Sequence, residues 1–212
     1  TITSMLNAVK LGARTLELDC VISADEKVVV SHDVYMSSDF MLKPDGSTIT
    51  KSEEKSLALY QMPYDSIRKF DGGSKPHPRF PEQKKMKTYK PLLSDLIDSV
   101  EVYVKKNNLK AVYYNVETKL FPQGDGFYNP APDIFVSLLM DVIKKKDIEN
   151  RTTIQSFDVR TLQVLHRENA KVKLALLLMN KDSFDDNISK LGFKPDIYSP
   201  YYTLVNEELV KK

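Results

Sequence analysis

Residues 12–33 read GARTLELDCVISADEKVVVSHD, and the argument about fold and function starts from this stretch. Glu17 and Asp19 stand in an apolar run, separated by one residue, and a second apolar run ends at His32. Side chains alternate between the two faces of a strand, so both acids are expected on one face and Cys20 on the other. Two carboxylates on one buried face repel each other, so they need a divalent cation or a bound proton.

The composition favours one globular domain. The 212 residues are 42% hydrophobic, which is enough for one sizeable core. The 31 basic and 29 acidic residues are mixed along the chain, so no nucleic-acid partner is expected. No apolar run approaches the roughly 18 residues of a membrane span. The single cysteine, Cys20, excludes an internal disulfide and is expected in the core, not as a nucleophile.

The rest of the chain alternates between expected strands and helices after an irregular segment at 34–91. Apolar runs predict six strands, at 15–22, 28–31, 111–116, 153–156, 173–178 and 196–199. Helical spacing precedes Gly12, where Thr3 can cap a short helix, and recurs at 93–104, 133–145, 159–165 and 184–191. This order predicts an α/β fold with a parallel sheet. The short link 23–27 alone predicts a hairpin between the first two strands.

The stretch resembles the glycerophosphodiester phosphodiesterase family. That family has an E-x-D pair on one barrel strand, an Asp-containing turn and a strand that closes with His-Asp, and residues 17–19, 24–27 and 32–33 match them. Phosphoinositide-specific phospholipases C share the LELDC wording, but segments 64–74 and 78–83 favour the first family. The resemblance implies one (β/α)8 TIM-barrel domain over 1–212, with about six strands visible and an inserted loop or subdomain at about 34–91. It also implies that the first two strands are parallel barrel neighbours.

The resemblance further implies a function and its residues. The expected activity is metal-dependent hydrolysis of small-molecule glycerophosphodiesters to glycerol 3-phosphate and an alcohol. The alternatives are a phospholipase C-like or D-like phosphodiesterase, or a non-catalytic domain that binds a phosphodiester. The implied cofactor is one divalent cation, Ca²⁺ or Mg²⁺. The implied residues are Glu17, Asp19 and Glu117 as metal ligands, His32 as an acid/base catalyst, and Lys119 and Phe157 as substrate contacts.

These residues also have ordinary structural interpretations. The two acids of the first strand could face solvent on an edge strand, and His32 could be a core histidine. Lys119 could form only a salt bridge with Glu117, and Phe157 could be a core aromatic residue. Segment 78–83 resembles a rim segment of many bacterial members, which favours a periplasmic or secreted enzyme.

Residues 1–212 alone are expected not to hydrolyse a glycerophosphodiester. In the family, a second histidine lies in a His-Arg-Gly motif on the first barrel strand, and residues 1–11 match the helix after that strand. His32 can fill one role in a given step, whereas His77 lies in the inserted loop and His166 in a helix. The measurement is an assay against glycerophosphocholine with Ca²⁺ or Mg²⁺, beside a version extended at both ends. Comparable activity of the two proteins would contradict the expectation.

Overall fold

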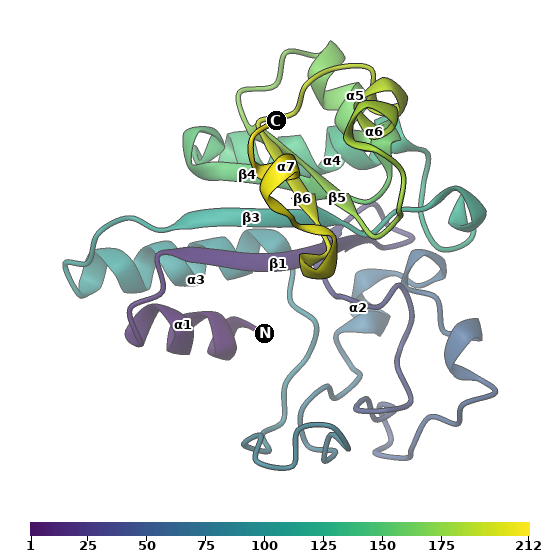
Figure 1. The fold of residues 1–212 in the computed structure, drawn as a ribbon. Coiled ribbons are helices and arrows are strands. Elements are labelled where there is room, and N and C mark those ends of the chain that lie inside the picture. Colours follow the sequence, from purple (N-terminus) through teal and green to yellow (C-terminus); the bar gives the residue numbers. More distant parts are fainter.

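The structure, a computed structural model, describes all 212 residues and contains one six-stranded sheet with helices packed against it (Figure 1). The strands are β1 Thr15–Ile22, β2 Val28–Val30, β3 Tyr113–Thr118, β4 Thr152–Ser156, β5 Lys173–Leu178 and β6 Ile197–Pro200. Their order in the sheet is β2-β1-β3-β4-β5-β6. All six predicted strands are present, with shifts of one or two residues at some ends.

The pair formed by β1 and β2 departs from the arrangement that the family resemblance implied. β2 runs antiparallel to β1, with Cys20 opposite Val30, whereas every other pair of neighbouring strands is parallel. Parallel pairing of these two strands is therefore wrong, and the hairpin predicted from the pattern is confirmed. A parallel crossover needs a dozen or more residues, and the link 23–27 is far too short for one.

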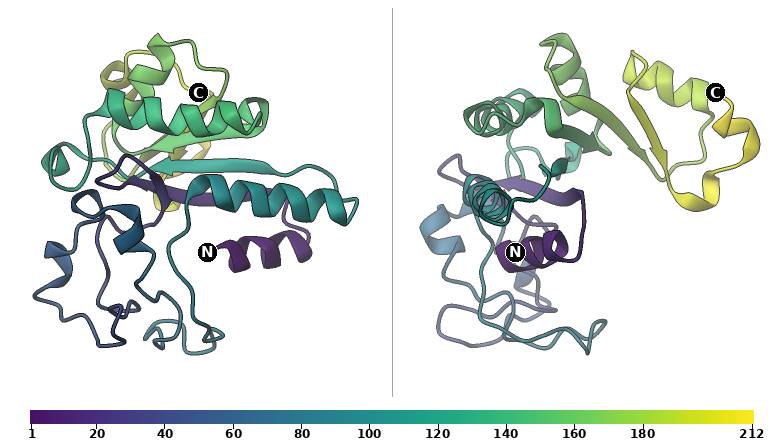
Figure 2. Two further views of the ribbon diagram at one scale, coloured as in Figure 1. Left: turned by 180° about the vertical axis from the view of Figure 1, so that it is seen from behind. Right: turned by 90° about the vertical axis from the view of Figure 1, so that its left-hand side faces the viewer.

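Helices cover the outer side of the sheet, and Figure 2 shows that the sheet is curved but open. The helices that contribute buried residues to the core against the sheet are α1 Ile2–Lys10, α3 Leu93–Lys106, α4 Pro132–Lys145, α5 Val159–Arg167 and α6 Phe184–Leu191. Two short helices, α2 Tyr64–Ile67 and α7 Glu207–Val210, contribute none to it. Thr1, not Thr3, caps α1, because its hydroxyl accepts a hydrogen bond from the Ser4 amide. The helices and the sheet share a core of 31 buried residues. No helix combines the length and the apolar character needed to cross a bilayer.

Strand alternation sends the apolar and the acidic side chains of β1 to different places. Leu16 and Leu18 are buried in the core beneath the helices. Glu17 and Asp19 alternate with them and lie on the opposite, inner face of the sheet. The same alternation in β3 buries Tyr114 and directs Asn115 to the inner face. The inner face therefore carries the polar residues.

Residues 34–91 form the irregular segment below the hairpin in Figure 1. The segment contains α2 and two 3-10 turns, Glu54–Ser56 and Leu59–Gln61. It has a smaller apolar core of nine buried residues, two of which, Val21 and Val29, come from the hairpin. The hairpin thus packs against the main core on one face and against the inserted segment on the other.

Asp25, in the hairpin turn, ties the inserted segment to the sheet. Its Oδ1 atom accepts hydrogen bonds from the Ser23 hydroxyl at 2.7 Å and from the Tyr64 amide at 2.8 Å. Desolvation raises the pKa of Asp25, but these hydrogen bonds outweigh it, so the pKa lies below its ordinary value of 3.8.

Replacing Asp25 by alanine is expected to lower the free energy of unfolding by about 1 kcal/mol at pH 7, because two hydrogen bonds at an exposed turn are lost. A carboxyl group with a lowered pKa stabilises the fold above its unfolded pKa, and this contribution disappears as the pH falls through the folded pKa. The difference from wild type should therefore shrink below about pH 4. Urea denaturation at several pH values measures it.

Asp65→Ala is the matched control, since the Asp65 side chain is 86% exposed and only pairs loosely with Arg68 at 3.7 Å. Equal losses in the two variants would show that Asp25 has no special role in holding the inserted segment.

Candidate functional site

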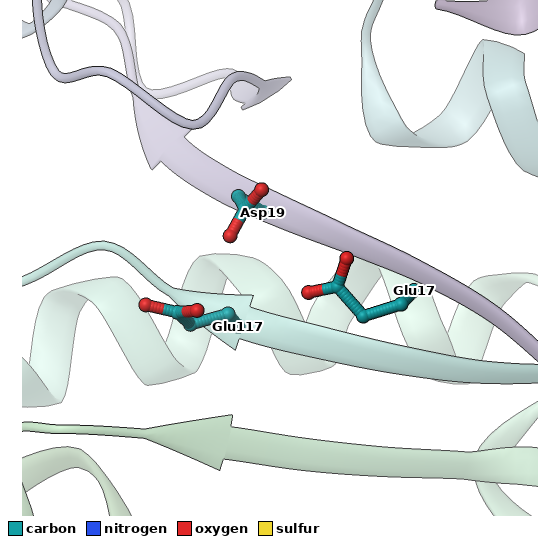
Figure 3. Close-up of side chains that lie close together, drawn as sticks. All are labelled: Glu17, Asp19 and Glu117. Carbon is teal, nitrogen blue, oxygen red and sulfur yellow. The ribbon is translucent and has the colours of Figure 1, made fainter. Parts of the chain in front are cut away.

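Two neighbouring strands bring three carboxylates together. β1 carries Glu17 and Asp19, and the β1–β3 register places Glu117 directly opposite Asp19. One oxygen of each residue lies within 4.8 Å of the others, and Figure 3 shows the three side chains close together on the two neighbouring strands. β2 pairs with β1 only from Cys20 to Ile22, so the part of β1 that carries the two acids pairs with β3 alone, and Glu17 is exposed there. The cluster lies toward the C-terminal ends of parallel strands, where α/β enzymes bind their ligands.

Lys119 supplies one positive charge to this cluster. Its Nζ atom is 2.7 Å from Glu117 Oε1 and 3.1 Å from Asp19 Oδ1, so the predicted salt bridge to Glu117 is present. Burial raises the pKa of Glu117 and Asp19 raises it further, although Lys119 opposes both. Three carboxylates against one ammonium group still leave an excess of negative charge, and a divalent cation would balance it.

Glu17 is held differently from the other two acids. Its carboxylate has no ion pair and accepts one hydrogen bond, from Gln155 Nε2 of β4 at 2.9 Å. Partial desolvation raises the pKa of Glu17, and the negative charges of Asp19 and Glu117 raise it further. Sequence reasoning assigned no role to Gln155. Its register position opposite Glu117 could not be known before the strand pairing was known.

The hairpin places His32 beside the carboxylates. The Ser31 amide donates a hydrogen bond to the Asp19 carbonyl at 2.9 Å, which fixes the end of β2 next to the cluster. The His32 side chain is 75% exposed, so the core-histidine interpretation is wrong. Its Nδ1 atom lies 3.0 Å from Asp33 Oδ1, and Nε2 has no hydrogen-bond partner. When protonated, His32 lowers the pKa of Glu17, which agrees with its place near the cluster.

Lys90 is a second buried cation that sequence reasoning missed. Its Nζ atom donates a hydrogen bond to the Ser31 hydroxyl at 2.7 Å, and Ser31 in turn donates to the Asp33 carbonyl. Burial lowers the pKa of Lys90 to about 8, with the charges of Asp33 and Asp19 opposing the shift. Lys90 therefore supports the turn that carries His32. Its position at the end of the irregular segment gave no signal of this contact.

Phe157 is exposed to solvent, whereas Cys20 is buried. Phe157 follows β4 directly and is 49% exposed, so its interpretation as a core aromatic residue is wrong. The next residue, Asp158, caps α5 by accepting a hydrogen bond from the Arg160 amide. Cys20 is fully buried on the opposite face of β1 from the acids, as predicted. Burial raises the pKa of its thiol well above the ordinary value, so Cys20 is a poor nucleophile.

Comparison with protein families gives one match. A family model described as the glycerophosphoryl diester phosphodiesterase family matches residues 1–208. A comparison with curated proteins finds no match.

Solved structures share the fold. A glycerophosphoryl diester phosphodiesterase from Silicibacter pomeroyi is 24% identical, with a TM-score of 0.84 over 100% of this chain and 73% of its own. A phosphodiesterase from Oleispira antarctica, in complex with the product sn-glycerol-3-phosphate, is 17% identical, with a TM-score of 0.71 over 100% and 72%. A glycerophosphodiester phosphodiesterase from Parabacteroides distasonis is 16% identical, with a TM-score of 0.63 over 96% and 67%. These matches support the barrel-type fold, of which six strands form an open sheet here.

Replacing Glu17 by glutamine is expected to raise the thermal midpoint of the metal-free protein at pH 7 by about 1–3 °C. A carboxyl group with a raised pKa favours folding only while it is protonated, so stability falls as the pH rises from below 4.5 through the folded pKa. The effect is small because Glu17 is partly exposed. Thermal unfolding in a chelator between pH 4 and 8 should show a flatter pH dependence for the variant.

Glu82→Gln serves as the control, because Glu82 is exposed, lies outside the helices and strands, and makes no side-chain hydrogen bond or ion pair. A lower midpoint for Glu17→Gln than for wild type would contradict the assigned repulsion among the carboxylates.

Proposed function

Because the chain belongs to the glycerophosphoryl diester phosphodiesterase family, we propose that it hydrolyses glycerophosphodiesters to glycerol 3-phosphate and an alcohol, with the help of a bound divalent cation. The observation that carries the proposal is the convergence of Glu17, Asp19 and Glu117 on one face of two parallel strands. The hairpin that carries His32 is bonded to the backbone of Asp19 through the amide of Ser31. The sn-glycerol-3-phosphate in the Oleispira antarctica relative supports this product. The family match over 1–208 favours this activity over the phospholipase alternatives.

The three carboxylates fit a hard divalent cation. Their donors are all oxygen atoms, which Ca²⁺ and Mg²⁺ prefer, and their nearest oxygens already lie within 4.8 Å of one another. Lys119 neutralises one of the three charges, and a divalent cation would neutralise the other two. When bound, the cation would act as a Lewis acid on a phosphodiester oxygen.

Lys119 is the proposed phosphate contact of the chain. Its ammonium group is mostly buried, with 16% of the side chain exposed, and is bonded to both Asp19 and Glu117. An ammonium group has three donors, so Lys119 can keep these two partners and still donate to a phosphate oxygen. Phe157, exposed at the end of β4, is proposed to form the wall against which the glycerol moiety packs.

His32 is the proposed general acid. Asp33 accepts a hydrogen bond from Nδ1, so Nε2 is the atom available for proton transfer. A protonated imidazole can transfer a proton to a leaving alkoxide. Its exposure gives a leaving group access to that atom.

In the version extended at both ends, His32→Ala is expected to lower the turnover of glycerophosphocholine by about 10²–10⁴-fold, the usual contribution of one acid or base. The affinity for Ca²⁺ or Mg²⁺ should be nearly unchanged, because His32 is not one of the three converging ligands. Steady-state kinetics and calorimetric titration of the metal measure the two quantities separately.

His166→Ala is the matched control, since His166 stacks on Phe193 with ring centroids 3.9 Å apart, outside the site. Its turnover should equal that of wild type within a factor of about two. Equal losses of metal binding and turnover in His32→Ala would make His32 a ligand and remove its assignment as the acid. Unchanged turnover in His32→Ala would overturn the assignment as well.

A further inference from the structure

Two amide side chains lie on the inner face of the sheet beside the carboxylates. Asn115 of β3 stands opposite Glu17 of β1, and Gln155 of β4 stands opposite Glu117 of β3. Gln155 is almost fully buried, with 8% of its surface exposed. Neither residue takes part in the acid/base or phosphate-binding roles described above, so their contacts call for another explanation.

The two amides form a directed chain of hydrogen bonds that ends at Glu17. Asn115 Nδ2 donates to Gln155 Oε1 at 2.9 Å, and Gln155 Nε2 donates to Glu17 Oε1 at 2.9 Å. A carboxylate only accepts hydrogen bonds, so the amide nitrogen of Gln155 must face Glu17. Asn115 enforces this orientation, because its donor group engages the amide oxygen of Gln155.

The amide pair is not an arrangement that packing alone would select. Asn115 Oδ1 is buried and has no hydrogen-bond partner. A buried acceptor without a partner lowers stability, whereas apolar side chains of the same size would fill the space without this penalty. The polar character of this pair therefore serves something other than the packing of the sheet.

Glu17 is the carboxylate that most needs such support. Lys119 holds both Asp19 and Glu117 through ion pairs, and the hydrogen bond from Gln155 is the one side-chain bond that Glu17 receives. Without it, repulsion from the other two acids would drive the flexible Glu17 side chain away from the cluster. A ligand that must be ordered when the metal binds weakens the binding.

We propose that Gln155, oriented by Asn115, is the positioning residue that holds Glu17 ready as a metal ligand. The proposal rests on the cation site proposed above. Hydrogen bonds to metal ligands typically change metal affinity by about 10–100-fold when they are removed. The amide relay, defined as Asn115, Gln155 and Glu17, therefore predicts a specific pattern of metal affinities.

The test is calorimetric titration of the protein with Ca²⁺ and, separately, with Mg²⁺. Gln155→Met keeps the length of the side chain but removes the donor, and it should weaken binding by about 10–100-fold. Asn115→Leu leaves Gln155 in place but frees its amide to turn, and it should weaken binding by a smaller factor. In the double variant, Asn115→Leu should add nothing to Gln155→Met, because Asn115 acts only through Gln155.

Gln163→Met is the matched control, since Gln163 also donates from a partly buried amide but to carbonyl groups of α6, at Lys190 and Leu191. It should leave the metal affinity unchanged. Thermal unfolding of every variant shows whether the chain is folded. If Gln155→Met does not fold, the metal affinity of Asn115→Leu decides the question. This variant is expected to fold, because the substitution removes the buried oxygen that has no hydrogen-bond partner.

Three outcomes would overturn the relay. If Gln155→Met binds the metal ion with wild-type affinity, Glu17 needs no support. The same conclusion holds if Gln155→Met does not fold and Asn115→Leu binds with wild-type affinity. Additive losses in the double variant would show that Asn115 acts independently, and equal weakening in Gln163→Met would show a general loss of stability. Asp19→Asn tests the cation site itself. If this variant loses metal binding while Gln155→Met binds normally, only the relay is refuted. Absence of binding by the wild-type protein refutes both.

Discussion

The parallel register between β1 and β3 is the constraint on which the site depends. It sets Asp19 directly opposite Glu117, so the backbone hydrogen bonds of the sheet hold two carboxylates together against their mutual repulsion. Lys119 follows β3 and bonds both acids, which compensates part of that repulsion. The uncompensated part is a local source of instability, as is common where function and stability compete, and it is the basis for the cation site proposed above.

The outer face of the sheet carries the apolar residues of the core, and the inner face carries the polar residues of the candidate site. Apolar residues that alternate with the acids pack under the helices and supply the hydrophobic free energy of folding. The polar residues of the inner face are not part of that core. The relay from Asn115 through Gln155 to Glu17 spans three neighbouring strands of this face. Because the spacing of these strands is fixed, the hydrogen bonds of the relay set the position of Glu17 Oε1.

His32 follows the second strand of the hairpin, whereas the three carboxylates lie on β1 and β3. Glu17, Asp19 and Glu117 come from parallel strands, whereas His32 comes from an antiparallel strand whose end is bonded to the backbone of Asp19. The short turn at 23–27 allows no other geometry, and Asp25 in the same turn also holds the inserted segment. One turn thus connects His32, the carboxylates and the second apolar core.

The sequence by itself determined the elements of this fold and most of its site, because both follow from periodicity over a few residues. Alternation in residues 15–22 put Glu17 and Asp19 on one face and Cys20 on the other, as the structure confirms. Only the tertiary structure decided which strands are neighbours, and so which distant residues meet. The bond from Gln155 to Glu17, the buried place of Lys90 and the exposure of Phe157 depend on that arrangement. No local pattern contains the register of strands nearly a hundred residues apart, because the packing of the whole sheet sets it.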